Sequence, residues 1–146
     1  MTEQFLTLSL PEQRVMLPTQ QLLEVLSLSA DRLSAIPDTP PYTMGVTNWR
    51  GEVLWVLDLS ALMGLEPLYR QPGRLRKFPV VIVTGPASPI GLAVVEVGKM
   101  VRCSTDELRS QSPELVKFGP GAWVSPERQT LLALSTDKLL DSPIKT

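Results

Sequence analysis

Short apolar segments interrupted by prolines are the feature that most constrains how this chain can fold. Fourteen of the 146 residues are proline, and a proline inside a helix or a central strand breaks its hydrogen bonding. The segment QFLTLSL alternates between two faces, and FPVVIV is apolar throughout, as in a strand buried on both faces. Helical periodicity is scarce. The pattern therefore predicts a mainly β protein built from small barrels and does not favour an α/β enzyme.

We expect strands at the apolar runs and turns between them. The predicted strands cover 4–10, 15–17, 22–28, 53–57, 78–83, 90–97, 99–103 and 130–134, and short helical segments are predicted at 60–63, 108–111 and 136–140. The segment GPASPIG joins two of these strands. Its glycines are spaced one residue too far apart for a phosphate-binding loop, so we expect a hairpin loop.

Three pairs of similar segments recur in order along the chain. The pairs are 22–25 with 94–97, 29–33 with 104–108, and 54–63 with 131–140. Their separation grows from 72 residues (Glu24 to Glu96) to 77 residues (Leu62 to Leu139). This order predicts two similar β modules in a pseudo-twofold arrangement. We expect one domain, 1–146, of two intertwined subdomains whose main parts are 15–65 and 78–140.

Composition excludes most kinds of active site. The chain has no histidine, which removes the commonest general base and the commonest metal ligand. Its single cysteine, Cys103, cannot form an internal disulfide or a zinc cluster, and as a nucleophile it would lack an imidazole partner. We expect no catalytic residue, no metal site and no cofactor. The thiol also suits a reducing compartment.

The acidic residues are scattered. Asp106 and Glu107 follow Ser104 in a pattern that caps a helical turn. Glu24 and Glu96 each lie in an apolar strand, and we interpret them as ion-paired or partner-facing carboxylates. The alternative is general-base catalysis by one of them, which would require a second positioned group.

Charge and hydropathy favour a soluble cytoplasmic protein. Hydrophobic residues make up 43% of the chain and charged residues 20%, with a net charge of −1. The N-terminal segment MTEQFLTLSLPEQ is acidic where a signal peptide is basic, and no apolar run reaches membrane-spanning length. The basic segment RQPGRLRK at 70–77 is interpreted as a solvated linker. The alternative is a small barrel that binds a ligand or single-stranded nucleic acid through this segment.

One region carries a specific resemblance. The strand LLEV at 22–25 is followed by a proline-containing loop at 36–42 and then by GVTNWRGEVLWVLDLSALMG at 45–64. This pattern resembles that of CheW-like domains. The resemblance is specific over 15–65 and thinner in the second half, where it depends on the apolar run at 91–97, the segment STDEL at 104–108 and the apolar segments at 131–140.

The resemblance implies a CheW-like fold of two small SH3-like, five-stranded β-barrel subdomains that share a hydrophobic core, with short helices. It also implies an adaptor without catalysis. Such proteins couple the cytoplasmic tip of chemoreceptors (methyl-accepting chemotaxis proteins) to the regulatory domain of a CheA-type histidine kinase, in chemotaxis or twitching motility. Ring contacts with itself or with paralogues are a further expectation, whereas nucleic acid binding and membrane insertion are not expected.

The family assigns receptor and kinase coupling to the arginine at the position of Arg50. We therefore expect Arg50 to organise a receptor-facing groove between the barrels. The alternative is structural: Gly51 permits a tight turn, and Arg50 pins the loop to carbonyl groups or to a carboxylate such as Glu24. The complete set of expected partner-binding residues is Leu22, Glu24, Gly45, Val46, Asn48, Trp49, Arg50 and Gly51.

Several positions depart from the family pattern. Trp49 stands where leucine is usual, Trp55 where proline is common, and Ser60 where arginine often follows. An exposed Trp49 would suit a contact with one particular partner, whereas the alternative places both tryptophans in the core between the barrels. We expect Asp58 to order the turn into 60–63, and Leu22 is either a groove residue or a core residue.

Overall fold

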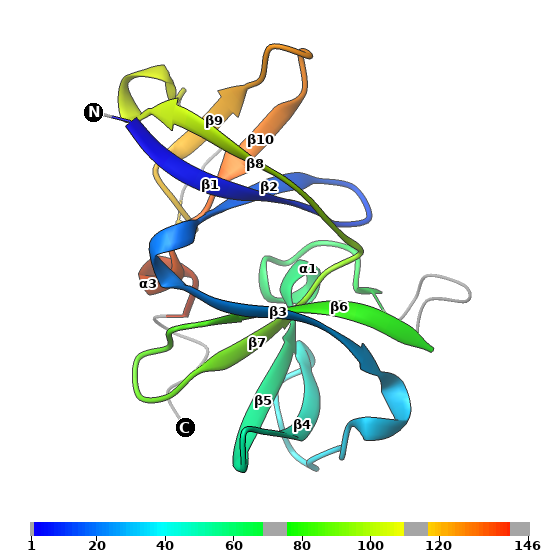
Figure 1. Ribbon diagram of the computed structural model, residues 1–146. Coiled ribbons are helices and arrows are strands. Elements are labelled where there is room, and N and C mark those ends of the chain that lie inside the picture. The colour runs from blue at the N-terminus through cyan, green and yellow to red at the C-terminus, as the bar shows by residue number, and fades with distance from the viewer. Residues whose placement is uncertain (1, 69–75, 110–116, 141–146) are drawn as a thin grey trace.

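The computed structural model describes residues 2–68, 76–109 and 117–140, which form ten strands and several short helices (Figure 1). The first half contains β1 (Thr2–Ser9), β2 (Arg14–Pro18), η1 (Thr19–Gln21), β3 (Leu22–Ser29), η2 (Ala30–Arg32), β4 (Thr43–Trp49), β5 (Glu52–Asp58) and α1 (Leu59–Leu62). The second half contains β6 (Lys77–Val83), β7 (Ile90–Ala93), β8 (Glu96–Ser104), η4 (Thr105–Glu107), β9 (Gly121–Val124), β10 (Thr130–Ala133) and α3 (Thr136–Leu140).

The strands form two five-stranded sheets, one above the other in Figure 1. Sheet A has the order β8-β1-β2-β10-β9, and sheet B has the order β3-β6-β7-β5-β4. Each sheet is antiparallel except for one parallel pair, which is β2 with β10 in sheet A and β5 with β7 in sheet B. The predicted mainly β class with two five-stranded units is confirmed.

The two halves repeat the same order of elements. From β1 to α1 each element except η1 has a counterpart between β6 and α3. The starts of counterparts lie 74 residues apart for β3 and β8 (Leu22 and Glu96) and 78 apart for β5 and β10 (Glu52 and Thr130). These separations resemble those of the repeated sequence segments. The duplication seen in the sequence therefore has a structural counterpart.

Each half contributes strands to both sheets. Sheet A combines β1 and β2 with β8, β9 and β10, whereas sheet B combines β3, β4 and β5 with β6 and β7. The segments 15–65 and 78–140, expected as the main parts of two intertwined subdomains, therefore do not correspond to one sheet each. The reason is that the chain crosses from one sheet to the other after β2 and again after β7.

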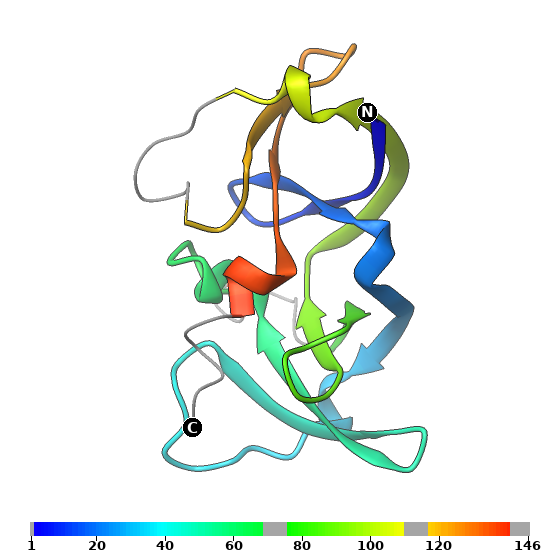
Figure 2. The same cartoon turned by 90° about the vertical axis from the view of Figure 1, so that its left-hand side faces the viewer.

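The core has three parts. The largest cluster lies between the sheets, because it contains side chains from β1, β2, β6, β7 and both α-helices. Figure 2 shows α1 and α3 near the junction of the two sheets. A second cluster belongs to sheet B and a third to sheet A. The expected shared core is thus the cluster between the sheets, and its buried side chains account for much of the burial of apolar surface that drives folding.

Two strands were absent from the sequence-based prediction. β4 and β9 each contain a glycine with positive φ, +145° at Gly45 and +151° at Gly121, which interrupts the alternation of apolar residues. The predicted strands 90–97 and 99–103 are instead β7 and β8, because the chain changes sheet at Val94. Of the turn predicted at 108–111, Arg109 pairs with Ala122 and 110–111 lie outside the described residues.

The predicted caps at Asp58 and Ser104 are confirmed. Asp58 caps α1, and its carboxylate accepts hydrogen bonds from the backbone amides of Ala61 (3.1 Å) and Leu68 (2.7 Å). Ser104 and Glu107 form a reciprocal capping box around η4. The segment GPASPIG is the loop between the antiparallel strands β6 and β7, as predicted. In the basic segment 70–77, residues 70–75 lie outside the described residues.

Candidate functional site

A single carboxylate oxygen joins the two edges of sheet B. Glu24 lies on β3, at one edge, and its Oε1 accepts a hydrogen bond from the guanidinium Nη2 of Arg50 at 3.0 Å. The same oxygen accepts a hydrogen bond from the indole Nε1 of Trp49, also at 3.0 Å, and Trp49 ends the opposite edge strand β4. The Glu24 interaction therefore closes sheet B across its open side.

Arg50 and Gly51 form the two-residue turn between β4 and β5. Both have positive φ (+53° and +80°), the combination required at the centre of a type I′ hairpin turn. The backbone amide of Gly51 donates to the side-chain oxygen of Asn48 at 3.2 Å. Asparagine and glycine are favoured at this turn position, because they adopt a positive φ more readily than arginine does. The turn therefore holds the backbone of Arg50 in an unfavourable conformation.

The Trp49 ring supports the arginine. The guanidinium carbon of Arg50 lies 4.7 Å from the centroid of the Trp49 ring, within the range of a cation–π contact. Trp49 is half-buried and packs against the cluster of sheet B. The proposed core position between the barrels is therefore wrong for Trp49, and its indole N–H is directed to Glu24.

Other predicted site residues have backbone or core roles. Gly45 is buried, and a Cβ atom there would lie 2.6 Å from the carbonyl oxygen of Ser34. Val46 exchanges two backbone hydrogen bonds with Ser34, at 2.8 and 3.0 Å. Leu22 is half-buried and packs against the cluster between the sheets, which favours the core interpretation. The structure thus brings together Glu24, Trp49 and Arg50, and the remaining positions shape the backbone that carries them.

Two exposed apolar side chains lie beside this site, and neither was among the expected partner-binding residues. Val53 and Trp55 on β5 are 68% and 37% exposed, and they pair across the hairpin with Asn48 and Val46, so these four share one face. Trp55 is thus not a core residue. The sequence pattern could have indicated Val53 and Trp55, because both alternate with the buried residues Leu54 and Val56.

The outward face of β3 is also apolar. Leu23 and Val25 are 47% and 41% exposed, and they point away from the face that carries Glu24. Alternation alone could not decide which face of β3 is buried, since each face carries apolar and polar residues, with Glu24 on one face and Ser27 on the other. β3 and β5 are not neighbouring strands of sheet B, so Leu23 and Val25 form a second exposed apolar group besides Val53 and Trp55.

Electrostatics of the site are those of an accessible ion pair. The side chains of Arg50 and Glu24 are 69% and 36% exposed, so water screens their attraction. Both donors reach Oε1, and no donor from the described residues reaches Oε2 of Glu24. This oxygen and the remaining guanidinium N–H groups are available to a partner, which makes the arrangement suited to recognition.

The single thiol of the chain has low nucleophilicity. Cys103 is buried, and burial raises its pKa, with the charges of Glu107 and Glu3 raising it further. A thiol of this kind is a poor nucleophile. Within 2–68, 76–109 and 117–140, no three histidine, cysteine, aspartate or glutamate residues are grouped closely enough to hold a metal ion. Glu24 is ion-paired, as we interpreted it, and Glu96 is exposed.

No helix in the described part of the chain is both long enough and apolar enough to cross a membrane.

Comparisons with known proteins agree with this architecture. The model of the CheW-like domain family matches residues 4–143. A probable chemotaxis protein CheW of Rhizobium etli is 30% identical over 82 residues, which cover 56% of this chain and 50% of that protein. Protein FrzA of Myxococcus xanthus is 44% identical over 57 residues, which cover 39% of this chain and 34% of FrzA. The chain thus spans half or less of the length of these two relatives.

A solved structure shares the fold. The scaffolding protein TtCheW from Thermoanaerobacter tengcongensis superposes with a TM-score of 0.77, covering 92% of this chain and 90% of that chain at 21% sequence identity.

Proposed function

Because this chain belongs to the CheW-like domain family, we propose that it is a non-catalytic cytoplasmic scaffold that couples chemoreceptors to a CheA-type histidine kinase. The match of the family model to residues 4–143 carries the proposal. The relatives named as a chemotaxis protein and as FrzA support signalling in chemotaxis or in a related motility system. The scaffold binds the cytoplasmic tip of the receptor and the regulatory domain of the kinase.

The surface around Glu24, Trp49 and Arg50 is our candidate for receptor binding. It offers a carboxylate oxygen, an arginine with spare donors and the exposed apolar side chains of Val53 and Trp55 on the neighbouring face. An apolar helix face with a few polar groups would find both kinds of contact here. Since Glu24 and Arg50 both belong to sheet B, their pair closes sheet B and does not bridge the two sheets.

A scaffold changes kinase activity only if it binds the active and inactive arrangements with different affinity. Such a role needs shape and hydrogen bonding but no proton transfer, which accounts for a chain without histidine. An accessible ion pair is suited to this role, because each of its members can exchange its partner at small cost in stability.

A reconstituted array tests the proposal. Receptor-containing membranes and the CheA-type kinase from the same organism are mixed with the purified protein, and both sedimentation of the protein and autophosphorylation of the kinase are measured. The wild-type protein is expected to sediment with the membranes and to change kinase activity. Arg50→Glu, which repels Glu24, is expected to weaken receptor binding at least about tenfold.

The matched control is Arg102→Glu, which makes the same charge change at an exposed position on β8 of sheet A. This variant should sediment like the wild type. The proposed function is overturned if the wild-type protein binds neither membranes nor kinase. If the wild type binds and Arg50→Glu binds equally well, the scaffold role stands and the receptor surface lies elsewhere.

A further inference from the structure

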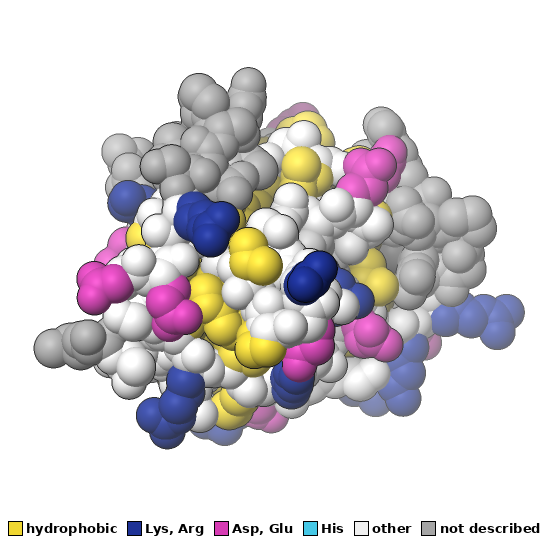
Figure 3. Space-filling model, turned by 90° about the horizontal axis from the view of Figure 1, so that it is seen from above, with side chains coloured by type: hydrophobic (Ala, Val, Ile, Leu, Met, Phe, Trp, Pro, Cys, Tyr) yellow, Lys and Arg dark blue, Asp and Glu magenta, His cyan; other side chains and the backbone are white. Residues whose placement is uncertain are grey.

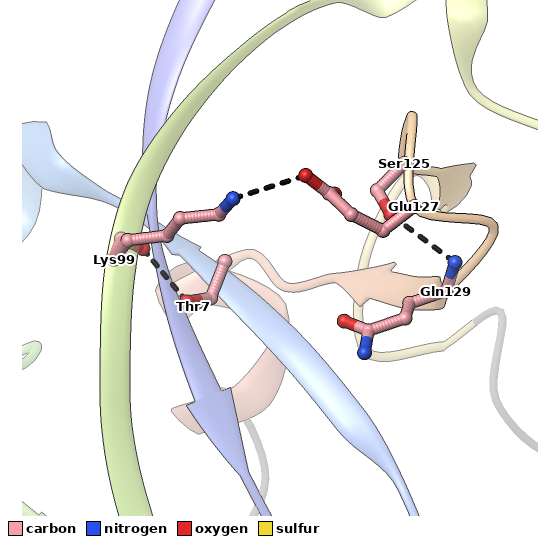
Figure 4. Close-up of polar contacts among 5 residues, drawn as sticks. All are labelled: Thr7, Lys99, Ser125, Glu127 and Gln129. Atoms are coloured by element: carbon pink, nitrogen blue, oxygen red, sulfur yellow. Dashed lines mark hydrogen bonds and ion pairs between the residues drawn. The ribbon is translucent and has the colours of Figure 1, made fainter.

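Sheet A contains a counterpart of the Glu24–Arg50 pair with the charges reversed. Glu24 on β3 and Lys99 on β8 lie 75 residues apart, the separation that also relates Ser29 to Ser104 at the ends of these strands. Both lie next to the point where the register with the neighbouring strand shifts. Lys99 Nζ lies 3.2 Å from Oε2 of Glu127, in the turn between β9 and β10 (Figure 4).

This ion pair borders a small cavity. The cavity has a volume of about 120 Å³, about the space of four liquid water molecules. Its walls come from β1, β2, β8 and the β9–β10 hairpin, and its lining residues are Thr7, Arg14, Gly98, Lys99, Val101, Ser125, Glu127, Gln129 and Leu131. Val101 and Leu131 provide apolar surface, and the charged groups belong to Arg14, Lys99 and Glu127. The site therefore combines an apolar wall with two cations and one anion.

The polar groups of the cavity are unequally satisfied. The hydroxyl of Thr7 donates to the carbonyl oxygen of Lys99 at 2.7 Å, and the hydroxyl of Ser125 accepts from the backbone amide of Gln129 at 3.1 Å, both drawn in Figure 4. Among the described residues no carboxylate lies within ion-pair distance of Arg14. The cavity thus has one more cation than it has anions to pair with.

The anion already present can be replaced. The side chains of Lys99 and Glu127 are 68% and 56% exposed, and ion pairs at such positions contribute little to stability. The hydrogen bond from Lys99 lowers the pKa of Glu127, so this carboxylate is charged at neutral pH. A second carboxylate that reaches Lys99 and Arg14 would gain two cationic partners, while Glu127 could turn out into solvent.

From this arrangement we propose that the cavity is a docking site, separate from the Glu24 surface, for an acidic side chain on a segment of a partner protein. The partner's carboxylate binds Lys99 and Arg14 in place of Glu127, and its methylene groups pack on Val101 and Leu131. The single-residue size of the cavity and its two cations match one glutamate or aspartate. A polyanion such as nucleic acid does not match, because acidic and basic side chains alternate on this end of the molecule (Figure 3).

The test uses the chain of residues 1–146, labelled with ¹⁵N, and two neutral-capped probes. N-acetyl-glutamate N-methylamide carries the carboxylate, and N-acetyl-glutamine N-methylamide is its uncharged counterpart. Backbone amide shifts are followed during titration with each probe at low ionic strength. The glutamate probe is expected to move the amides of Gly98, Lys99, Ser125 and Gln129, and the glutamine probe is expected to leave them unchanged.

Two variants should change the affinity in opposite directions. Lys99→Gln removes the main cation and is expected to weaken binding of the glutamate probe at least about fivefold, whereas Glu127→Gln removes the competing anion and is expected to strengthen it. Lys77→Gln, at an exposed position of β6 in sheet B, is the matched control and should bind like the wild type. Unchanged spectra across the variants show that all remain folded.

Three results would overturn the proposal. Equal shifts with the glutamine probe would show that the carboxylate is not recognised. Undiminished binding to Lys99→Gln would show that the anion binds elsewhere. Tighter binding of inorganic phosphate than of the glutamate probe at the same amides would identify a general anion site in place of an acidic side-chain site.

Discussion

The backbone of Gly45 passes so close to Ser34 that a Cβ atom at Gly45 would lie 2.6 Å from the Ser34 carbonyl oxygen. The second half of the chain repeats this approach, since a Cβ at Gly121 would lie 2.5 Å from the carbonyl oxygen of Arg109. In both places a short bridge holds an edge strand, β4 or β9, against the segment that follows the third strand of its repeat. A close backbone approach that requires glycine is therefore found at one edge of each sheet, on β4 of sheet B and on β9 of sheet A.

Gly45→Ala is expected to lower the free energy of unfolding by about 2–4 kcal/mol, since it adds a steric overlap to a strained positive φ. Gly64→Ala is the control, because Gly64 also has positive φ (+77°) but has open space around it, and its cost should be near 1 kcal/mol. Urea unfolding of both variants measures the difference. Equal losses of unfolding free energy in the two variants would show that the overlap with the Ser34 carbonyl oxygen adds no cost.

The Glu24–Arg50 pair should contribute little to stability. A double-mutant cycle with Glu24→Gln and Arg50→Gln is expected to give a coupling energy of about 0.3–1 kcal/mol, because both side chains are partly exposed. Urea unfolding of the wild type, the two single variants and the double variant gives this energy. A coupling of several kcal/mol would mean that the pair is a structural support and not an exchangeable contact.

Asp58 should make stability depend on pH in a defined direction. Burial raises its pKa, and hydrogen bonds from the backbone amides of Ala61, Leu68 and Ser60 oppose the rise only in part. In the window between the ordinary pKa of an aspartate and this raised value, the folded state binds more protons than the unfolded state. The stabilising contribution is therefore complete below the ordinary pKa and is lost as pH rises through the raised one.

Urea unfolding of the wild type and of Asp58→Asn from pH 3 to 7 measures this contribution. The stability of the wild type relative to the variant should fall as pH increases through the window and then remain constant. A relative stability that rises with pH would mean that the backbone hydrogen bonds to Asp58 outweigh its burial.

Cys103 should react slowly while the protein is folded. It is buried on β8 and its pKa is raised, so little thiolate is present or accessible at neutral pH. A colorimetric disulfide reagent is expected to label the native protein far more slowly than the protein in urea. Cys103→Ala should leave the proposed binding of receptor and kinase unchanged. Rapid labelling of the native protein would contradict the burial of this side chain.

Because each sheet contains strands from both halves of the chain, we expect that neither half folds alone. A fragment of residues 1–70 lacks the strands β6 and β7 that sheet B needs, and a fragment of 71–146 lacks β1 and β2 of sheet A. Circular dichroism should show little β structure for either fragment and a gain of β structure when the two are mixed. A folded, monomeric fragment would show that its repeat can form its own barrel.

Much of the fold was predictable from local sequence. Apolar runs such as Phe78–Val83 identified buried strands, and Ser104 and Asp58 identified the caps of short helices. These features depend on neighbouring residues, whose side chains and backbone interact whatever the rest of the chain does. The prediction failed at β4 and β9, where a glycine required by a distant carbonyl group interrupted the pattern.

The mainly β class, the duplicated order of elements and the carboxylate and arginine of the candidate site follow from the order of residues alone. Two relationships do not: each repeat gives strands to both sheets, and Glu24 accepts hydrogen bonds from both Trp49 and Arg50 through one oxygen. The hydrogen bonds to Glu24 join residues 25 and 26 positions apart. Their geometry depends on strand register and on where the chain crosses between sheets, which local propensity does not specify.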